Sequence, residues 1–70
     1  MNGLHARLLA AHDGNDRAAL VALYTEAAEA APDAEAAGFF LTQAYVYALD
    51  LGHPAAPALH ARLAAQGREA

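Results

Sequence analysis

Histidine is the residue type in this chain best suited to hold a metal ion, and its spacing limits how such a site could form. His5 and His12 lie seven residues apart near the start of the chain, and His53 and His60 lie seven apart near its end. Zinc accepts imidazole nitrogens, but ligands on one helix normally stand three or four residues apart. A four-histidine site therefore requires the first and last helices to pack side by side. The spacing favours the other interpretation, in which all four are ordinary surface or helix-end histidines.

Few groups in the chain could carry covalent or acid–base catalysis. There is no Cys, Ser or Lys, and the only aliphatic hydroxyls are those of Thr25 and Thr42. A Thr within a helix usually bonds to a carbonyl one turn earlier, and we expect this of Thr42. Glu26 and Glu29 stand three residues apart, as is typical of a solvated helix face. The glycines are isolated, so no phosphate-binding loop is present. The sequence predicts a protein that is not an enzyme and has no cofactor.

The charge balance excludes several classes of partner. The formal net charge is −4, from four Arg and eight acidic residues. Nucleic-acid binding requires clustered cations, so this balance argues against a nucleic-acid or anionic membrane partner. No window reaches the roughly 18 apolar residues of a membrane span, and the first residues lack a secretory pattern. We expect a cytoplasmic protein, and the excess of Ala, Arg and Gly over Lys, Ile and Ser is typical of a GC-rich bacterial genome.

The composition predicts a strongly helical chain with a thin core. Of the 70 residues, 57% are hydrophobic, but 22 are Ala, which favours helices and buries little area. A single domain over residues 1–70 of this kind rarely gains more than about 3–5 kcal/mol without disulfides, metal or oligomerisation. Because the chain has no Cys, oligomerisation or docking on a partner is the favoured source of further stability.

Capping and stop residues divide the chain into four expected helices. Asp16 and Asp33 are suited to N-cap positions, and Gly14 and Gly52 to left-handed stops. Pro54 is suited to the first position of the last helix. The expected helices cover residues 2–12, 17–31, 34–51 and 54–66. Their short connections predict an all-α fold of four antiparallel helices, arranged as two stacked helical hairpins.

Three of these helices have a single apolar face and the third is apolar nearly all round. The single faces consist of Leu4, Leu8 and Ala11; of Leu20, Leu23, Tyr24, Ala27 and Ala31; and of Ala56, Leu59 and Leu63. A helix that is apolar all round is normally buried all round, but three Ala-rich helices cannot easily cover it. We therefore expect Phe40, Leu41 and Tyr45 inside. The predicted protein interface consists of Phe39, Gln43, Val46, Tyr47 and Asp50.

Gly38 interrupts the third expected helix at a cost of about 1 kcal/mol relative to Ala. One interpretation is a close helix crossing, or a notch for a partner beside Phe39 and Phe40. The other is a helix that begins slightly later, with Gly38 in a loose first turn. The sequence leaves both open.

The turn residues and the spacing of apolar residues over residues 4–66 resemble those of a tetratricopeptide repeat. Residues 14–16 are similar to the turn between the helices of that repeat, and Tyr24, Ala27 and Pro32 stand at the spacing of its second helix. Leu41 and Tyr45 resemble positions in the first helix of a second repeat. The first helix lacks the family's aromatic and Gly positions, and the third is about one turn too long. The resemblance, to about two degenerate repeats, implies a protein-binding scaffold.

Together these patterns predict a non-enzymatic protein–protein interaction module, a small scaffold or adaptor. Its partner would be another protein or a second copy of the chain, held by the apolar third helix. The alternative is a small metal- or ligand-binding protein that uses the four histidines.

Overall fold

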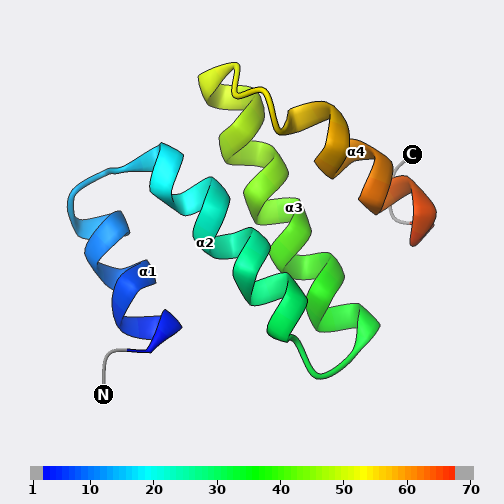
Figure 1. The fold of residues 1–70 in the computed structure, drawn as a ribbon, viewed down its shortest axis with the longest axis horizontal. Coiled ribbons are helices and arrows are strands. Elements are labelled where there is room, and N and C mark those ends of the chain that lie inside the picture. Colours follow the sequence, from blue (N-terminus) through cyan, green and yellow to red (C-terminus); the bar gives the residue numbers. More distant parts are fainter. Residues whose placement is uncertain (1–2, 68–70) are drawn as a thin grey trace.

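The computed structural model describes residues 3–67. This part of the chain is all-α and contains no strand, which confirms the predicted fold class. The four helices are α1 (Leu4–Asp13), α2 (Arg17–Ala30), α3 (Ala34–Leu51) and α4 (Ala56–Ala65). Consecutive helices run antiparallel and form two hairpins, α1–α2 and α3–α4, which stack through α2 against α3 (Figure 1).

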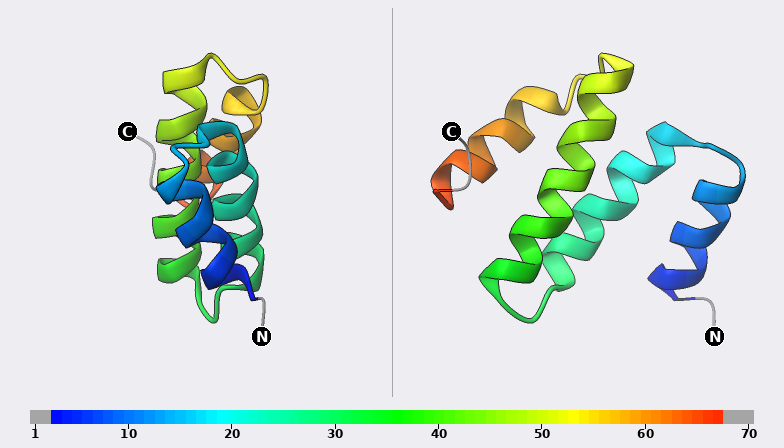
Figure 2. Two further views of the ribbon diagram at one scale, coloured as in Figure 1. Left: turned by 90° about the vertical axis from the view of Figure 1, so that its left-hand side faces the viewer. Right: turned by 180° about the vertical axis from the view of Figure 1, so that it is seen from behind.

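The helices form a thin layer in which each one packs only against its neighbours in sequence. Backbone contacts join α1 to α2, α2 to α3 and α3 to α4, and no other pair of the four helices. The Cα atoms span 33 × 29 × 14 Å. Viewed along the layer, α3 stands toward one side and α2 toward the other (Figure 2). A layer of this kind leaves part of every helix uncovered.

Local capping explains why α2 and α3 begin where the sequence predicts. The carboxylate of Asp16 accepts a hydrogen bond from the backbone N–H of Ala19 at 3.1 Å, and that of Asp33 accepts one from Ala36 at 2.8 Å. Each bond satisfies one of the free N–H groups of a helix start. At the end of α3, Gly52 has the predicted left-handed conformation, with φ of 66°.

The structure corrects two predictions about the helix ends, namely the left-handed conformation of Gly14 and the start of the last helix at Pro54. After α1 the left-handed residue is Asn15, with φ of 53°, whereas Gly14 has φ of −87°. Asn tolerates this conformation better than most residues, so the glycine is not needed there. The last helix begins at Ala56 and not at Pro54, because His53 closes the intervening turn: its Nδ1 accepts a hydrogen bond from the N–H of Ala55 at 3.0 Å.

The core consists of two clusters, one on each side of α2. Between α1 and α2, Leu20 and Leu23 are buried against Ala11. Between α2, α3 and α4 lies the larger cluster of Val21, Ala28, Leu41, Ala44, Ala48, Leu59 and Leu63. The predicted inner faces of α1 and α4 are confirmed, but the single face predicted for α2 omits Val21 and Ala28. A helix with a neighbour on each side must bury two faces.

Gly38 is the fifth residue of α3 and is buried. The interpretation that places it in a loose first turn is therefore wrong. Its burial within the helix is consistent with close packing of α3 at this point.

Candidate functional site

One face of α3 carries a row of apolar side chains that the rest of the fold leaves uncovered. Phe39, Val46 and Leu49 are 57%, 53% and 57% exposed, and exposed Thr42 lies among them. Successive spacings of three, four and three residues keep these four on one face of an α-helix. We call them the outer stripe. An exposed apolar row on a folded chain is typical of an interaction surface.

The predicted interface overlaps the outer stripe in part. Phe39 and Val46 belong to the stripe, and Gln43 and Asp50 lie beside it. Asp50 is exposed and forms an ion pair with Arg17 of α2. The prediction omits Leu49, although its spacing of three residues from Val46 is the helical signal that could have found it.

Tyr47 is the predicted interface residue that the structure places elsewhere. Its ring is half-buried and stacks on Tyr24 of α2, with a centroid distance of 6.1 Å and an interplanar angle of 7°. It also meets the edge of His12 of α1 at 6.2 Å. Since each helical residue turns by about 100°, Tyr47 points away from its neighbour Val46 and toward the junction of α1 and α2. The expected position of Tyr47 on the uncovered face is thus wrong.

A shallow apolar groove between α3 and α4 adjoins the outer stripe. Its volume is about 310 Å³, and its lining residues are Tyr45, Leu49, Ala56, Pro57 and His60. The rings of Tyr45 and His60 lie 5.7 Å apart across it. Because Leu49 belongs to both the stripe and the groove, the two form one continuous surface.

An aromatic cluster centred on Tyr24 holds α1, α2 and α3 together. Tyr24 stacks between Phe40 and Tyr47, at centroid distances of 6.2 and 6.1 Å. Its hydroxyl lies 2.9 Å from Nε2 of His12, within hydrogen-bond distance. Burial is the main cause that raises the pKa of Tyr24 above 10.0, and the neighbouring Tyr47 hydroxyl adds to it. The cluster therefore joins three helices of the fold, and the imidazole of His12 has the hydroxyl of Tyr24 as its partner.

The raised pKa of Tyr24 predicts a loss of stability in alkaline solution. The folded state holds the phenol proton more tightly than the unfolded state, so this contribution is complete below pH 10 and is lost as the pH rises through the folded pKa. Tyr24→Phe is expected to make the fall between pH 9 and pH 11 shallower, because it removes the ionising group. Urea unfolding of both proteins across this range measures the effect, and equal slopes would contradict it.

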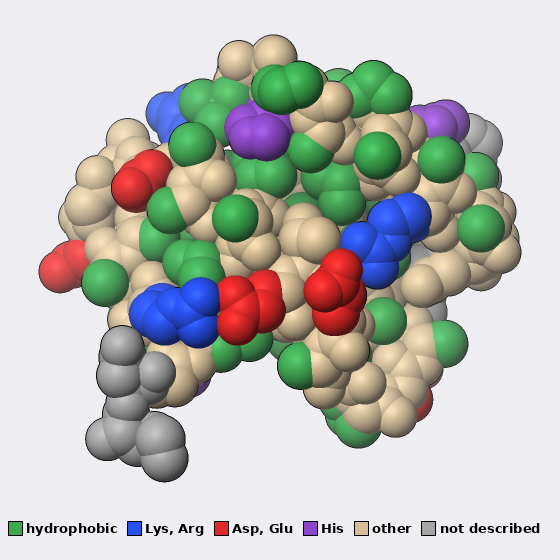
Figure 3. Space-filling model, viewed as in Figure 1, with side chains coloured by type: hydrophobic (Ala, Val, Ile, Leu, Met, Phe, Trp, Pro, Cys, Tyr) green, Lys and Arg blue, Asp and Glu red, His purple; other side chains and the backbone are tan. Residues whose placement is uncertain are grey.

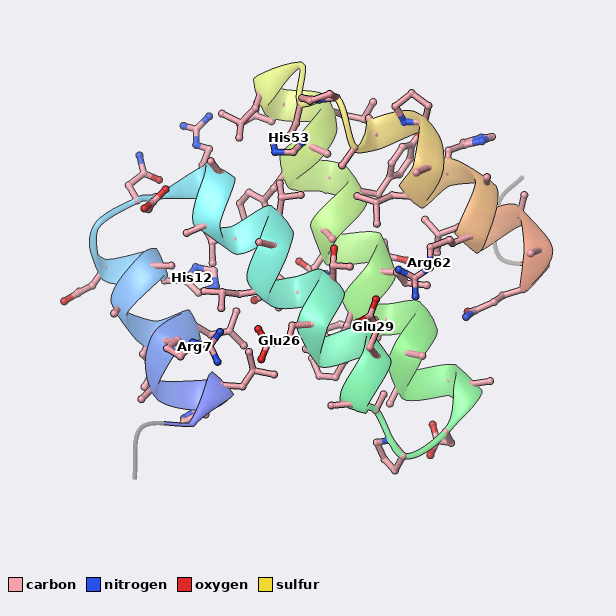
Figure 4. The ribbon with its side chains drawn as sticks, in the orientation of Figure 1. Arg7, His12, Glu26, Glu29, His53 and Arg62 are labelled. Carbon is pink, nitrogen blue, oxygen red and sulfur yellow. The ribbon has the colours of Figure 1, made fainter. Side chains whose placement is uncertain are left out.

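The acidic face of α2 is exposed, as predicted, but each of its carboxylates is ion-paired. Arg7 of α1 donates two hydrogen bonds to Glu26, at 2.7 and 3.1 Å, and these hold the pKa of Glu26 below its usual value. Arg62 of α4 lies 3.6 Å from Glu29. Both pairs lie on the same broad face of the layer (Figures 3 and 4). The two pairs link the outer helices to α2.

The two threonine hydroxyls are engaged within their own helices. Thr42 donates to the carbonyl of Gly38 at 2.8 Å, which confirms the predicted bond, and Thr25 donates to that of Val21 at 2.8 Å. Neither hydroxyl is paired with a base that could activate it.

The histidines are not brought together. His5 and His12 lie on α1, His60 lies on α4, and His53 lies in the turn before α4. Helices α1 and α4 are not in contact, and His12 and His53 are far apart in Figure 4. Residues 3–67 contain no group of three or more His, Cys, Asp or Glu side chains placed to hold a metal ion. The packing required for a four-histidine site is not met.

The fold and the surface define a chain of two stacked helical hairpins with an uncovered apolar face. Its described helices include none that is both long and apolar enough to cross a bilayer. No family model matches the chain, and neither does any curated protein or solved structure.

Proposed function

We propose that this chain is a non-enzymatic protein–protein interaction module that associates with a second copy of itself through the outer stripe of α3. The observation that carries the proposal is the exposure of Phe39, Val46 and Leu49 in a row on a folded helix. Burial of this row would contribute about 25 cal/mol per Å² of apolar area, before the cost of association.

The thin core supports a role for association. The buried apolar residues of the described chain include five alanines and only six larger side chains: Leu20, Val21, Leu23, Leu41, Leu59 and Leu63. Domains of this size gain stability from oligomerisation when they lack disulfides and metal. The tetratricopeptide-like pattern of the sequence supports the same class of function.

The net charge of −4 and the lack of Cys support the remaining parts of the proposal. An acidic chain repels nucleic acid, so the proposed partner is a protein. A chain without Cys needs no oxidising compartment, in keeping with a cytoplasmic location.

A single tryptophan at the stripe tests the proposed function, because the chain has no Trp of its own. We expect the fluorescence of Phe39→Trp to shift to the blue as the protein concentration rises from micromolar to near-millimolar, since association removes the indole from water. The matched control is Leu9→Trp on α1, which replaces a residue of similar exposure (58%) outside the stripe. Constant emission from both variants would contradict the proposed function.

A further inference from the structure

We infer that two copies of the chain pack their α3 helices antiparallel about a two-fold axis, and that Phe39 of each copy enters the groove between α3 and α4 of the other. This inference rests on the proposed function and specifies the partner surface and the register. It follows from the spacing of the stripe, the position of the groove and the distribution of charge.

The spacing of the outer stripe reads the same in both directions along α3. The steps from Phe39 through Thr42 and Val46 to Leu49 are three, four and three residues. In an antiparallel pair with this register, Phe39 faces Leu49 of the second copy and Thr42 faces Val46 of the second copy. The same surface on both copies is then self-complementary, as a two-fold interface requires. The small Thr beside the β-branched Val also suits the close approach of two helices near the axis.

The groove lies where this register places the largest side chain of the stripe. Phe39 of the second copy faces Leu49, and Leu49 is a lining residue of the groove. The rest of the lining is mainly apolar or aromatic, with Tyr45 on α3 and Pro57 on α4. An aromatic side chain held in an apolar pocket is the kind of residue that dominates interface energies.

The size of a specific interface also requires the α4 side of the groove. An 18-residue helix is about 27 Å long and about 10 Å wide, so α3 alone offers a narrow strip. Specific complexes of the smallest class bury about 600 Å² on each copy, roughly one seventh of the 4266 Å² surface of this chain. A specific dimer therefore needs area beyond α3, and the groove with its α4 wall adjoins the stripe and can supply it.

The charges near the stripe permit two acidic chains to meet there. No charged residue stands between positions 36 and 49 of α3. Of the two acidic residues of the helix, Asp50 is ion-paired with Arg17 of α2, and Glu35 lies in the first turn. The centre of the proposed contact is therefore free of like-charge repulsion despite the net charge of −4.

Cysteine cross-linking tests the register, because the chain has no Cys of its own. Thr42→Cys and Val46→Cys proteins are mixed in equal amounts, allowed to exchange subunits and oxidised gently. Intact-mass spectrometry then separates the mixed disulfide dimer from the two homodimers. The antiparallel register predicts a mixed product several-fold above the amount expected from random pairing, since these two positions face each other.

Three other outcomes overturn the inference in distinguishable ways. Homodimers in excess would indicate parallel helices. No cross-link in a protein that light scattering shows to be dimeric would place the interface elsewhere. A wild-type chain that stays monomeric under the same conditions would contradict the proposed function as well.

A comparison of variants at positions 58 and 60 tests whether Phe39 of the second copy enters the groove. His60→Glu places a carboxylate in the path of Phe39 of the second copy, and we expect it to raise the dimer dissociation constant by at least about tenfold. The uncharged variant His60→Gln and the charged variant Ala58→Glu are the controls. Position 58 lies about 200° around α4 from His60, on the side away from the groove. Equal dissociation constants for His60→Glu and Ala58→Glu, in proteins of unchanged helicity, would contradict the groove assignment.

Discussion

Leu41→Ala is expected to unfold a large fraction of the protein at room temperature. Leu41 of α3 is fully buried (0% exposed) in the larger cluster, which also contains Val21 of α2 and Leu59 and Leu63 of α4. Truncation of a buried Leu costs about 2–5 kcal/mol, from lost transfer free energy and from the cavity. This is comparable with the total stability of about 3–5 kcal/mol expected for a core of this size.

Urea unfolding followed by circular dichroism measures this effect, at a low protein concentration so that association adds little stability. Leu9→Ala is the matched control, because it makes the same chemical change at a side chain that is 58% exposed. We expect the control to change the free energy of unfolding by less than about 0.5 kcal/mol. A Leu41→Ala protein as stable as the control would mean that the helices do not pack as described.

The helix boundaries could be predicted from the sequence because capping is local. Asp16 and Asp33 each bond to the backbone three residues ahead, and Gly52 adopts the left-handed conformation that ends α3. The start of α4 could not be predicted in the same way. Both Pro54 and Pro57 are suited to the first turn of a helix, and the structure uses Pro57. Pro54 lies in the preceding turn, which the hydrogen bond from the N–H of Ala55 to Nδ1 of His53 closes.

The composition of the candidate surface could be predicted only in part, because periodicity does not say which neighbour covers which face. Phe39 and Val46 are exposed as expected, whereas Tyr47 is covered by Tyr24 and His12. Leu49 is exposed because α4 leaves the nearby end of α3 open as a groove. The separation of the histidines could not be predicted from the sequence either. It arises because α1 and α4 lie at opposite ends of the row of helices and make no contact.

Val46→Glu is expected to abolish association over the concentration range in which the wild type dimerises, while the chain stays helical. Val46 is 53% exposed, so the change removes little of the monomer's core. In the proposed dimer Val46 lies near the two-fold axis and faces Thr42 of the second copy. Each copy of the variant would therefore bury a carboxylate with no cationic partner. We expect the dissociation constant to rise by at least about 100-fold, which corresponds to about 2.7 kcal/mol.

The measurement that tests the central claim most directly is the absolute mass in solution of the wild type, Val46→Glu and Ala58→Glu. Size-exclusion chromatography with light scattering would be run on all three proteins over the same concentrations. Self-association through the outer stripe predicts that the wild type and Ala58→Glu approach twice the 7.2 kDa of one chain, while Val46→Glu stays at 7.2 kDa. A single-chain mass for all three, or a doubled mass that Val46→Glu retains, would contradict the claim.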